Sequence, residues 1–153
     1  MNAEKIGALK KDEFKTYLLN VSDLGEISLD AVKNRIQYID NLLESFGQPP
    51  SEGDFLLIVM NGKPRSWFTL PPGVLNIGRE ESSDIVLEDP SASRRHCQIR
   101  KDRNNWLVED KKSKNGIFVN GKKTTERLLC EGDIIRIGTV ELIYINNRKL
   151  DFV

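Results

Sequence analysis

Residues 75–97 read LNIGREESSDIVLEDPSASRRHC, and this stretch decides the fold. Two short apolar runs, 75–77 and 85–87, flank a polar loop, and a second polar loop leads to an alternating run at 96–101. Short apolar runs bounded by Gly, Pro, Ser and Asp are typical of β-strands joined by turns. The stretch therefore predicts strands whose connecting loops are rich in charged and hydroxyl side chains.

The same pattern of short apolar runs separated by polar turns continues on both sides of this stretch. We predict strands at residues 55–60, 65–70, 74–77, 85–87, 96–101, 106–110, 117–119, 134–137 and 140–145. The dipeptides Asn61-Gly62 and Asn120-Gly121 indicate tight turns, because Asn and Gly tolerate positive φ. Many short strands within about 100 residues indicate a mainly β protein with a sandwich architecture.

The chain before residue 50 has a helical pattern instead. Ser28 is a good N-cap, and Gly47 stands where a helix commonly ends. A weaker helical pattern covers residues 3–19. The stripe that we expect the clearer helix to bury is formed by Leu29, Val32, Ile36, Ile39, Leu42 and Phe46.

We therefore expect an N-terminal helical segment with two helices at residues 1–50 and a β-sandwich domain at 51–153. Two helices cannot enclose a core by themselves. They would pack on the β domain, on another copy of the chain, or on a partner protein.

Composition excludes several classes of function. The chain has 23 basic and 23 acidic residues, so its net charge does not favour coating nucleic acid or an anionic membrane. The first twenty residues carry charges throughout, and no apolar stretch approaches the roughly 20 residues of a membrane span. We expect an intracellular protein, cytoplasmic or nuclear, with nucleic acid an improbable partner.

Cysteine and histidine are scarce. Cys97 and Cys130 are the two cysteines and His96 is the single histidine, so neither a disulfide scaffold nor a zinc site is expected. We expect both thiols to be reduced and to lie in or near a core. No nucleophile accompanied by a base is evident. The sequence thus predicts no catalytic residues, no metal and no cofactor.

Four short motifs occur on predicted turns: Gly78-Arg79, residues 93–96, Asn115-Gly116 and Asn120-Gly121. Each motif is weak evidence alone. In an antiparallel sandwich, however, alternate loops meet at the same end, so their side chains can face one spot. That spot would combine the guanidinium groups of Arg79 and Arg94 with the hydroxyl of Ser93 and the amide of Asn115. Such a set of donors suits the oxygens of a phosphate.

The motifs also resemble those of the forkhead-associated (FHA) family. The resemblance runs from residue 55 to residue 145 through the segments LNIGR (75–79), SDIVL (83–87), SRRHC (93–97), VED (108–110), SKNGIFVNG (113–121) and LCEGDIIRIG (129–138). It implies an FHA-type β-sandwich of about eleven strands whose loops at one end bind phosphothreonine peptides.

The resemblance also implies roles for individual residues. Arg79 and Ser93 would contact the phosphate, Arg94 would support it or touch the peptide, and Asn115 would bond the peptide main chain. Lys114 stands where many relatives have Ser or Thr, which leaves the role of that position open. The residues expected to support the site structurally are Gly78, His96, Gly116 and Asn120. Trp106 and Phe118 are expected in the core.

We therefore expect a phosphothreonine-dependent interaction module that acts as an adaptor for threonine-phosphorylated proteins in kinase signalling. The alternative is a phosphate-independent interaction or oligomerisation module that acts through the N-terminal helices. An enzymatic function has no support. The remaining basic loop residues are expected to be solvated charges; these residues are Arg95, Lys111, Lys112, Lys122 and Lys123. Those of them that lie near Arg79 would speed the capture of acidic phosphopeptides.

Overall fold

The computed structural model describes residues 28–147. The helix expected at residues 3–19 lies outside this range. The chain divides into two compact units, Met1–Gln48 and Pro49–Val153. Each unit is considered by itself.

The described part of the first unit is helix α2, Leu29–Phe46. Its N-terminus is capped by Ser28, whose Oγ accepts a hydrogen bond from the backbone N–H of Ala31 at 3.1 Å. At its other end Gly47 has a φ of 102° and donates its N–H to the carbonyl of Leu43. The predicted apolar stripe is buried only in its middle, because Leu29 and Phe46 are 48% and 37% exposed. The buried residues are Val32, Ile39 and Leu42.

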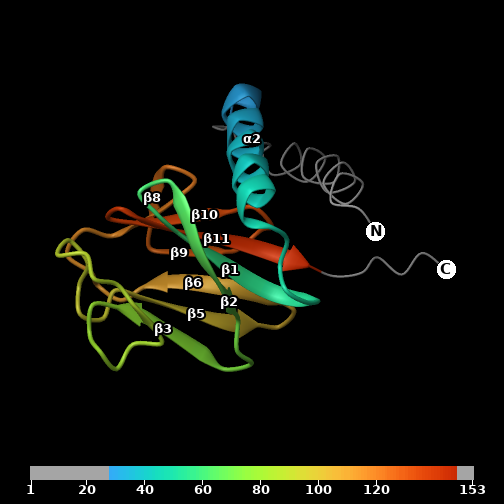
Figure 1. The fold of residues 1–153 in the computed structure, drawn as a ribbon. Helices are drawn as coiled ribbons and strands as arrows, with labels where there is room; N and C mark the ends of the chain where they lie inside the picture. Colours follow the sequence, from blue (N-terminus) through green and yellow to red (C-terminus); the bar gives the residue numbers. More distant parts are fainter. Residues whose placement is uncertain (1–27, 148–153) are drawn as a thin grey trace. The chain divides into compact units, whose positions relative to one another are not determined.

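The second unit contains eleven strands between residues 53 and 147. They are β1 (Gly53–Met60), β2 (Lys63–Thr69), β3 (Val74–Gly78), β4 (Ile85–Val86), β5 (Cys97–Asp102), β6 (Asn105–Asp110), β7 (Ile117–Val119), β8 (Lys122–Thr124), β9 (Glu126–Leu128), β10 (Ile134–Ile137) and β11 (Val140–Asn147). They form a six-stranded sheet in the order β2-β1-β11-β10-β7-β8 and a five-stranded sheet in the order β4-β3-β5-β6-β9. The two sheets lie as two layers (Figure 1).

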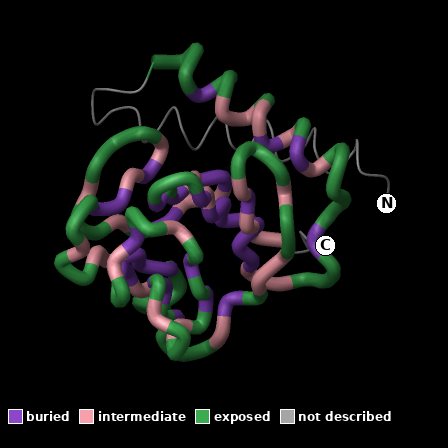
Figure 2. The backbone as a smooth tube through the Cα atoms, turned by 60° about the vertical axis from the view of Figure 1, so that its left-hand side comes forward, coloured by how far each residue is buried: buried purple, intermediate pink, exposed green. Residues whose placement is uncertain are grey.

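Neighbouring strands are antiparallel, with the short parallel pair β3 and β4 as the exception among the described pairs. Both sheets turn one face toward a shared apolar core, and exposed residues are concentrated on the connecting loops (Figure 2). The largest fully buried members of this core are Leu56, Leu75, Ile77, Ile99, Ile117, Ile135, Ile137 and Leu142. This arrangement confirms the predicted mainly β sandwich.

Two details differ from the sequence-based predictions. Strands β8 and β9 were not predicted, because their segments Lys122–Thr124 and Glu126–Leu128 are polar and lie at sheet edges. Trp106 lies in the core as expected, whereas Phe118 does not. Phe118 is half-buried, and the guanidinium carbon of Arg136 lies 4.7 Å from the centroid of its ring.

The carboxylate of Asp133 is fully buried and joins the two sheets. It accepts hydrogen bonds from the guanidinium of Arg127, which belongs to β9, at 3.0 and 3.3 Å. It also accepts from the side-chain amide of Asn120 and the backbone N–H of Cys130, each at 2.9 Å. A buried charge is tolerated when paired and hydrogen-bonded in this way. Asp133 therefore fixes β9 and the turn before β8 to the start of β10.

Replacing Asp133 by Ala should lower the free energy of unfolding by about 3 kcal/mol, because it leaves a half-buried guanidinium and two partly buried donors without their acceptor. Urea denaturation followed by tryptophan fluorescence measures this loss. The matched control is Glu126→Ala, since Glu126 is exposed on the neighbouring strand. Equal stabilities of the two variants would contradict the role given to Asp133.

Candidate functional site

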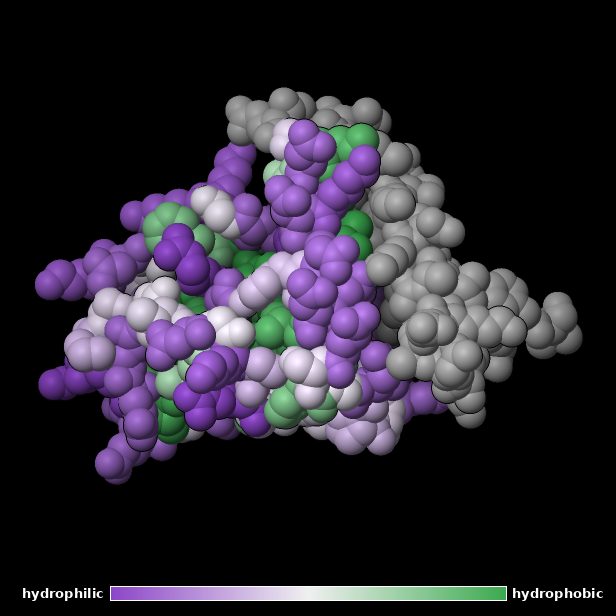
Figure 3. All heavy atoms as spheres, turned by 45° about the horizontal axis from the view of Figure 1, so that its top comes forward, coloured by the Kyte–Doolittle hydropathy of each residue, from purple (hydrophilic) through white to green (hydrophobic). Residues whose placement is uncertain are grey.

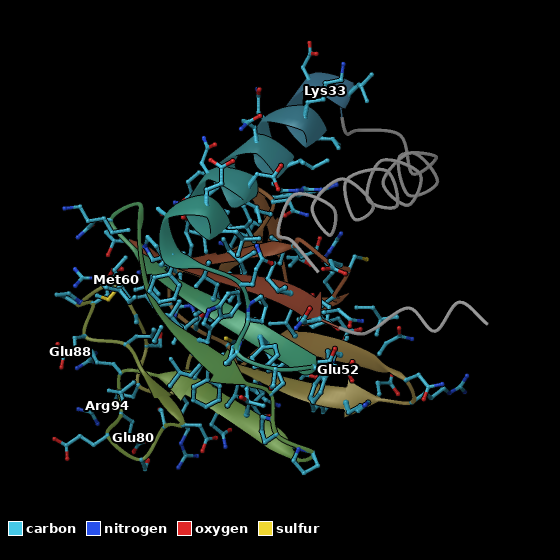
Figure 4. The ribbon with its side chains drawn as sticks, turned by 45° about the vertical axis from the view of Figure 1, so that its right-hand side comes forward. Lys33, Glu52, Met60, Glu80, Glu88 and Arg94 are labelled. Atoms are coloured by element: carbon cyan, nitrogen blue, oxygen red, sulfur yellow. The ribbon has the colours of Figure 1, made fainter. Side chains whose placement is uncertain are left out.

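Three loops meet at one end of the sandwich. They are residues 79–84 after β3, residues 87–96 before β5, and residues 111–116 between β6 and β7. They share an end because β3 and β6 finish there, while β5 and β7 begin there. Hydrophilic side chains project from this end (at the left in Figure 3). Arg94, Glu80 and Glu88 are found together here (Figure 4).

The 87–96 loop lies between the other two and is bonded to both. On one side its Ser93 and Arg94 carbonyls accept the backbone N–H groups of Arg79 at 3.0 Å and Glu80 at 3.1 Å. On the other side the hydroxyl oxygen of Ser93 accepts the backbone N–H of Lys114 at 2.9 Å. Ser93 is thus the point at which the three loops are joined.

The predicted phosphate ligands have unused donors at this junction. Arg79 is exposed, and its Nε donates to the carbonyl of Ala92 at 3.1 Å, which fixes the plane of the guanidinium. Its terminal nitrogens have no partner within residues 28–147. The Ser93 hydroxyl is used as an acceptor, so its proton remains available to a ligand. The arrangement offers a fixed fork of N–H groups beside an O–H group.

The other predicted ligands surround this pair. The side-chain amide of Asn115 donates to the carbonyl of Ser91 at 2.8 Å, and the residue is exposed. The side chains of Arg94 and Lys114 are exposed and have no partner in the described part of the chain. Lys114 contributes its backbone N–H to the junction, so its ammonium is independent of the loop's own structure.

The ring of His96 joins the 87–96 loop to the 111–116 loop. The residue is 1% exposed. Its Nδ1 accepts the backbone N–H of Ser93 at 3.0 Å, so the ring proton must be on Nε2, which donates to the carbonyl of Gly116 at 2.8 Å. His96 therefore has a structural position, with neither nitrogen free for a ligand.

Gly78 has a steric reason to be glycine. A Cβ atom at this position would collide with the carbonyl oxygen of Arg94. The 87–96 loop can lie this close to β3 only because the side chain is missing. The close approach is what allows the backbone bonds between Arg79 and Ser93.

Asn120 lies at the opposite end of β7 from Gly116 and has a φ of 53°. Its side-chain oxygen accepts the backbone N–H of Ile134 at 2.9 Å, in addition to its bond to Asp133. Asn120 thus holds the far end of β7, and its side-chain hydrogen bonds within residues 28–147 go to Asp133 and Ile134.

Two residues that the sequence analysis did not single out also shape the site. The hydroxyl of Ser113 accepts the backbone N–H of Gly116 at 2.9 Å and donates to the carboxylate of Asp110. This closes the 111–116 loop on itself. The spacing Ser-x-x-Gly after a strand is the signal that could have identified it.

Asp89 is the second such residue. Its carboxylate accepts the N–H and the hydroxyl of Ser91 at 2.9 and 2.7 Å, and the N–H and the hydroxyl of Thr139 at 2.8 Å each. These bonds, with the N–H of Thr139 contributing most, hold the pKa of Asp89 well below its ordinary value. Because the carbonyl of Ser91 receives the amide of Asn115, Asp89 connects the β10–β11 turn to the site.

Within residues 28–147, no three His, Cys, Asp or Glu side chains are grouped so that they could hold a metal ion. In the same range, no helix combines the length and apolar character needed to cross a membrane. Both cysteines are free thiols, and burial raises the pKa of the Cys97 thiol far above its ordinary value.

Comparison with known proteins is consistent across sequences and structures. The family model of the FHA domain matches residues 75–138. The glycogen accumulation regulator GarA of Mycobacterium tuberculosis is 36% identical over 104 residues, which are 67% of this chain and 63% of that protein. An oxoglutarate dehydrogenase inhibitor of Corynebacterium jeikeium is 37% identical over 99 residues, 64% of this chain and 69% of that protein. The chain thus spans about 63% of the length of the first curated relatives that it matches.

Solved structures agree. The FHA domain of FhaA, in a complex with the intracellular domain of another protein, has a TM-score of 0.55 and 36% identity, and the match covers 60% of this chain and 99% of that one. A domain from a study of phosphothreonine-dependent FHA interactions has a TM-score of 0.56 and 32% identity, covering 62% of this chain and 99% of that one.

Gly78→Ala should lower the free energy of unfolding by about 2 kcal/mol, because the added methyl group forces the 87–96 loop away from β3. Hydrogen exchange at the N–H groups of Arg79 and Glu80 should become faster. Gly73→Ala is the matched control, since a Cβ there would meet nothing within 4 Å. If both variants were as stable as the wild type, the close approach at Gly78 would have no energetic importance.

Asp89→Asn should lower stability at neutral pH, because the neutral amide is a poorer acceptor for the four donors. The sign follows from the lowered pKa: the stabilisation by the ionised Asp89 is complete above the ordinary aspartate range and is lost as the pH falls below it. Thermal unfolding midpoints of wild type and variant should therefore differ by a constant amount above about pH 5 and converge in acid. A difference that grew in acid would contradict this account.

Proposed function

This chain belongs to the forkhead-associated family, and on that premise we propose that residues 51–153 form a module that binds threonine-phosphorylated partner proteins. Residues 1–50 are the accompanying helical segment. The protein would act as an intracellular adaptor under the control of a kinase. The observation that supports this most directly is the guanidinium of Arg79 at the loop junction that contains the Ser93 hydroxyl: it is fixed through Nε, and its two terminal nitrogens have no partner among residues 28–147.

The proposed contacts follow from the available donors. The terminal nitrogens of Arg79 bind two phosphate oxygens, and the Ser93 hydroxyl binds a third. Arg94 and Lys114 are exposed cations on the two adjoining loops and can each approach the phosphate from outside. Asn115 offers its free side-chain oxygen and second amide proton to the main chain of an extended peptide. The phosphate would thus be held by charge and the peptide by main-chain bonds.

The strength of binding can be judged from these contacts. A charge-assisted hydrogen bond contributes about 1.5–3 kcal/mol net. Three or four of them must offset the freedom lost on association, which leaves about −8 kcal/mol, a dissociation constant near micromolar. Without the phosphate these donors would have no acceptor, so an unphosphorylated peptide should bind far more weakly. The proposed module is therefore a reversible docking site controlled by phosphorylation.

The proposal is a binding module and not an enzyme. The histidine at the loop end cannot serve as a general base, because both of its ring nitrogens are used by the backbone. The names of the similar proteins, a regulator and an inhibitor, agree with this choice. Docking of residues 1–50 on a second copy or on a helical partner stays a prediction, since residues 1–27 lie outside the described range.

Arg79→Ala should raise the dissociation constant for a phosphothreonine peptide by at least about 100-fold, because two charge-assisted bonds are lost. The fold should persist, since the Arg79 side chain makes one hydrogen bond to the protein. Fluorescence anisotropy with a labelled peptide measures the affinity, and circular dichroism checks the fold. The control is Arg103→Ala, in the exposed β5–β6 turn at the other end of the sandwich. Unchanged affinity of Arg79→Ala would show that the phosphate binds elsewhere.

A further inference from the structure

The two outer loops of the site carry opposite charges. The 79–84 loop contains Glu80, Glu81 and Asp84, with Arg79 as its one cation. The 111–116 loop contains Lys111, Lys112 and Lys114 and no acidic residue. The net charge of the whole chain is zero, so the separation is a local property of the binding end.

These charged loops lie on opposite sides of the phosphate ligands. Ser93 and Arg94 accept the backbone of the acidic loop through their carbonyls. The hydroxyl of Ser93, the carbonyl of Ser91 and the ring of His96 receive or contact the lysine loop. The 87–96 loop, which provides Ser93, is therefore the centre, with acidic side chains on one side and lysines on the other.

Lys123 extends the lysine side. It belongs to β8, where it pairs with Phe118. Its aliphatic chain crosses Gly116 so closely that a Cβ atom on Gly116 would touch the Cδ, Cγ and Cε atoms of Lys123. This places the aliphatic chain of Lys123 against the residue that follows Asn115. We call Lys112, Lys114 and Lys123 the lysine bank, and Glu80 and Glu81 the acidic bank.

Few of these charges are neutralised by the protein itself. Lys111 is bonded to Glu109 at 2.6 Å and is left out of the bank for that reason. Glu80 is 3.4 Å from Arg95, but the side chain of Arg95 is 86% exposed, so this pair is weak. Among the described residues, most charges of both banks are thus open to a ligand that lies across the site.

We propose that the site selects phosphothreonine peptides whose two flanks are oppositely charged, with the acidic flank on the lysine bank and the basic flank on the acidic bank. This rests on the proposed function, since the phosphate at Arg79 and Ser93 fixes the centre of the peptide. An extended peptide has a direction, and its main-chain bond to Asn115 is made in one direction. One order of the two flanks therefore fits, and the reversed order places like charges against each other.

Three phosphothreonine peptides test the proposal: one with an acidic flank before and a basic flank after the phosphothreonine, one with the reverse order, and one with neutral flanks. Affinities for the full chain are measured by isothermal titration calorimetry. We expect one charged order to bind about ten-fold more tightly than the other, with the neutral peptide between them, since each exposed pair changes affinity by a factor of about two. The preference should shrink in 0.5 M salt.

Charge-reversing variants test whether the preference for one order of flanks comes from the lysine bank and the acidic bank. Lys112→Glu and Glu81→Lys should each reduce the ratio of the two affinities by about four-fold, because one peptide exchanges an attraction for a repulsion while the other exchanges a repulsion for an attraction, about two-fold each. The ratio is the useful readout, since a general effect on phosphate binding cancels in it. Arg103→Glu and Asp102→Lys make the same charge changes in the β5–β6 turn, at the other end of the sandwich, and should leave the ratio unchanged.

Equal affinities for both charged orders would overturn the charge preference while leaving phosphothreonine binding intact. The charge preference would also be overturned if the two control variants changed the ratio of affinities as much as Lys112→Glu and Glu81→Lys do. Failure of all three phosphopeptides to bind more tightly than their unphosphorylated forms would overturn the proposed function, and the charge preference with it.

Discussion

The site depends first on a buried imidazole. His96 is enclosed by protein, and each ring nitrogen has one backbone partner, Ser93 on one loop and Gly116 on another. No water can replace either partner at this depth, so separating the two loops would leave buried polar groups without bonds. The distance between the loops is therefore set by the width of one ring. Ser93 and Asn115 keep their relative positions because of this link.

The remaining constraints act through the backbone, which leaves the charged side chains free. Gly78 permits the approach of the Arg94 carbonyl, Ser113 closes its own loop, and Asp89 connects Ser91 to Thr139. None of these contacts uses the terminal nitrogens of Arg79. A site whose loops are already fixed loses less conformational freedom when a peptide binds. This explains how an exposed cluster of few donors could bind a phosphopeptide with useful affinity.

Much of this could be read from the sequence, for identifiable reasons. Nine strands were predicted because their apolar residues face the core, and the caps of α2 because Ser28 and Gly47 are typical cap residues. Strands β8 and β9 were missed because edge strands with polar residues have no apolar pattern. The bond between Asp89 and Thr139 was not predicted because the two residues are distant in the sequence. Lys123 was expected only as a solvated charge, because its contact with Gly116 is made through its aliphatic chain. Local patterns contain no information on such contacts.

Position 114 shows how affinity and selectivity can be separated. The site requires the backbone N–H of residue 114, which any residue except proline supplies, and the hydroxyl of Ser93 accepts it here from a lysine. The side chain is therefore free to change without loss of the loop structure. In this chain it adds an ammonium to the loop that is bonded to Ser93, in the same loop as Lys112 and near the chain of Lys123 that crosses Gly116. In the proposed complex the phosphate would supply most of the binding energy, while exposed charges, each individually weak, would decide between partners.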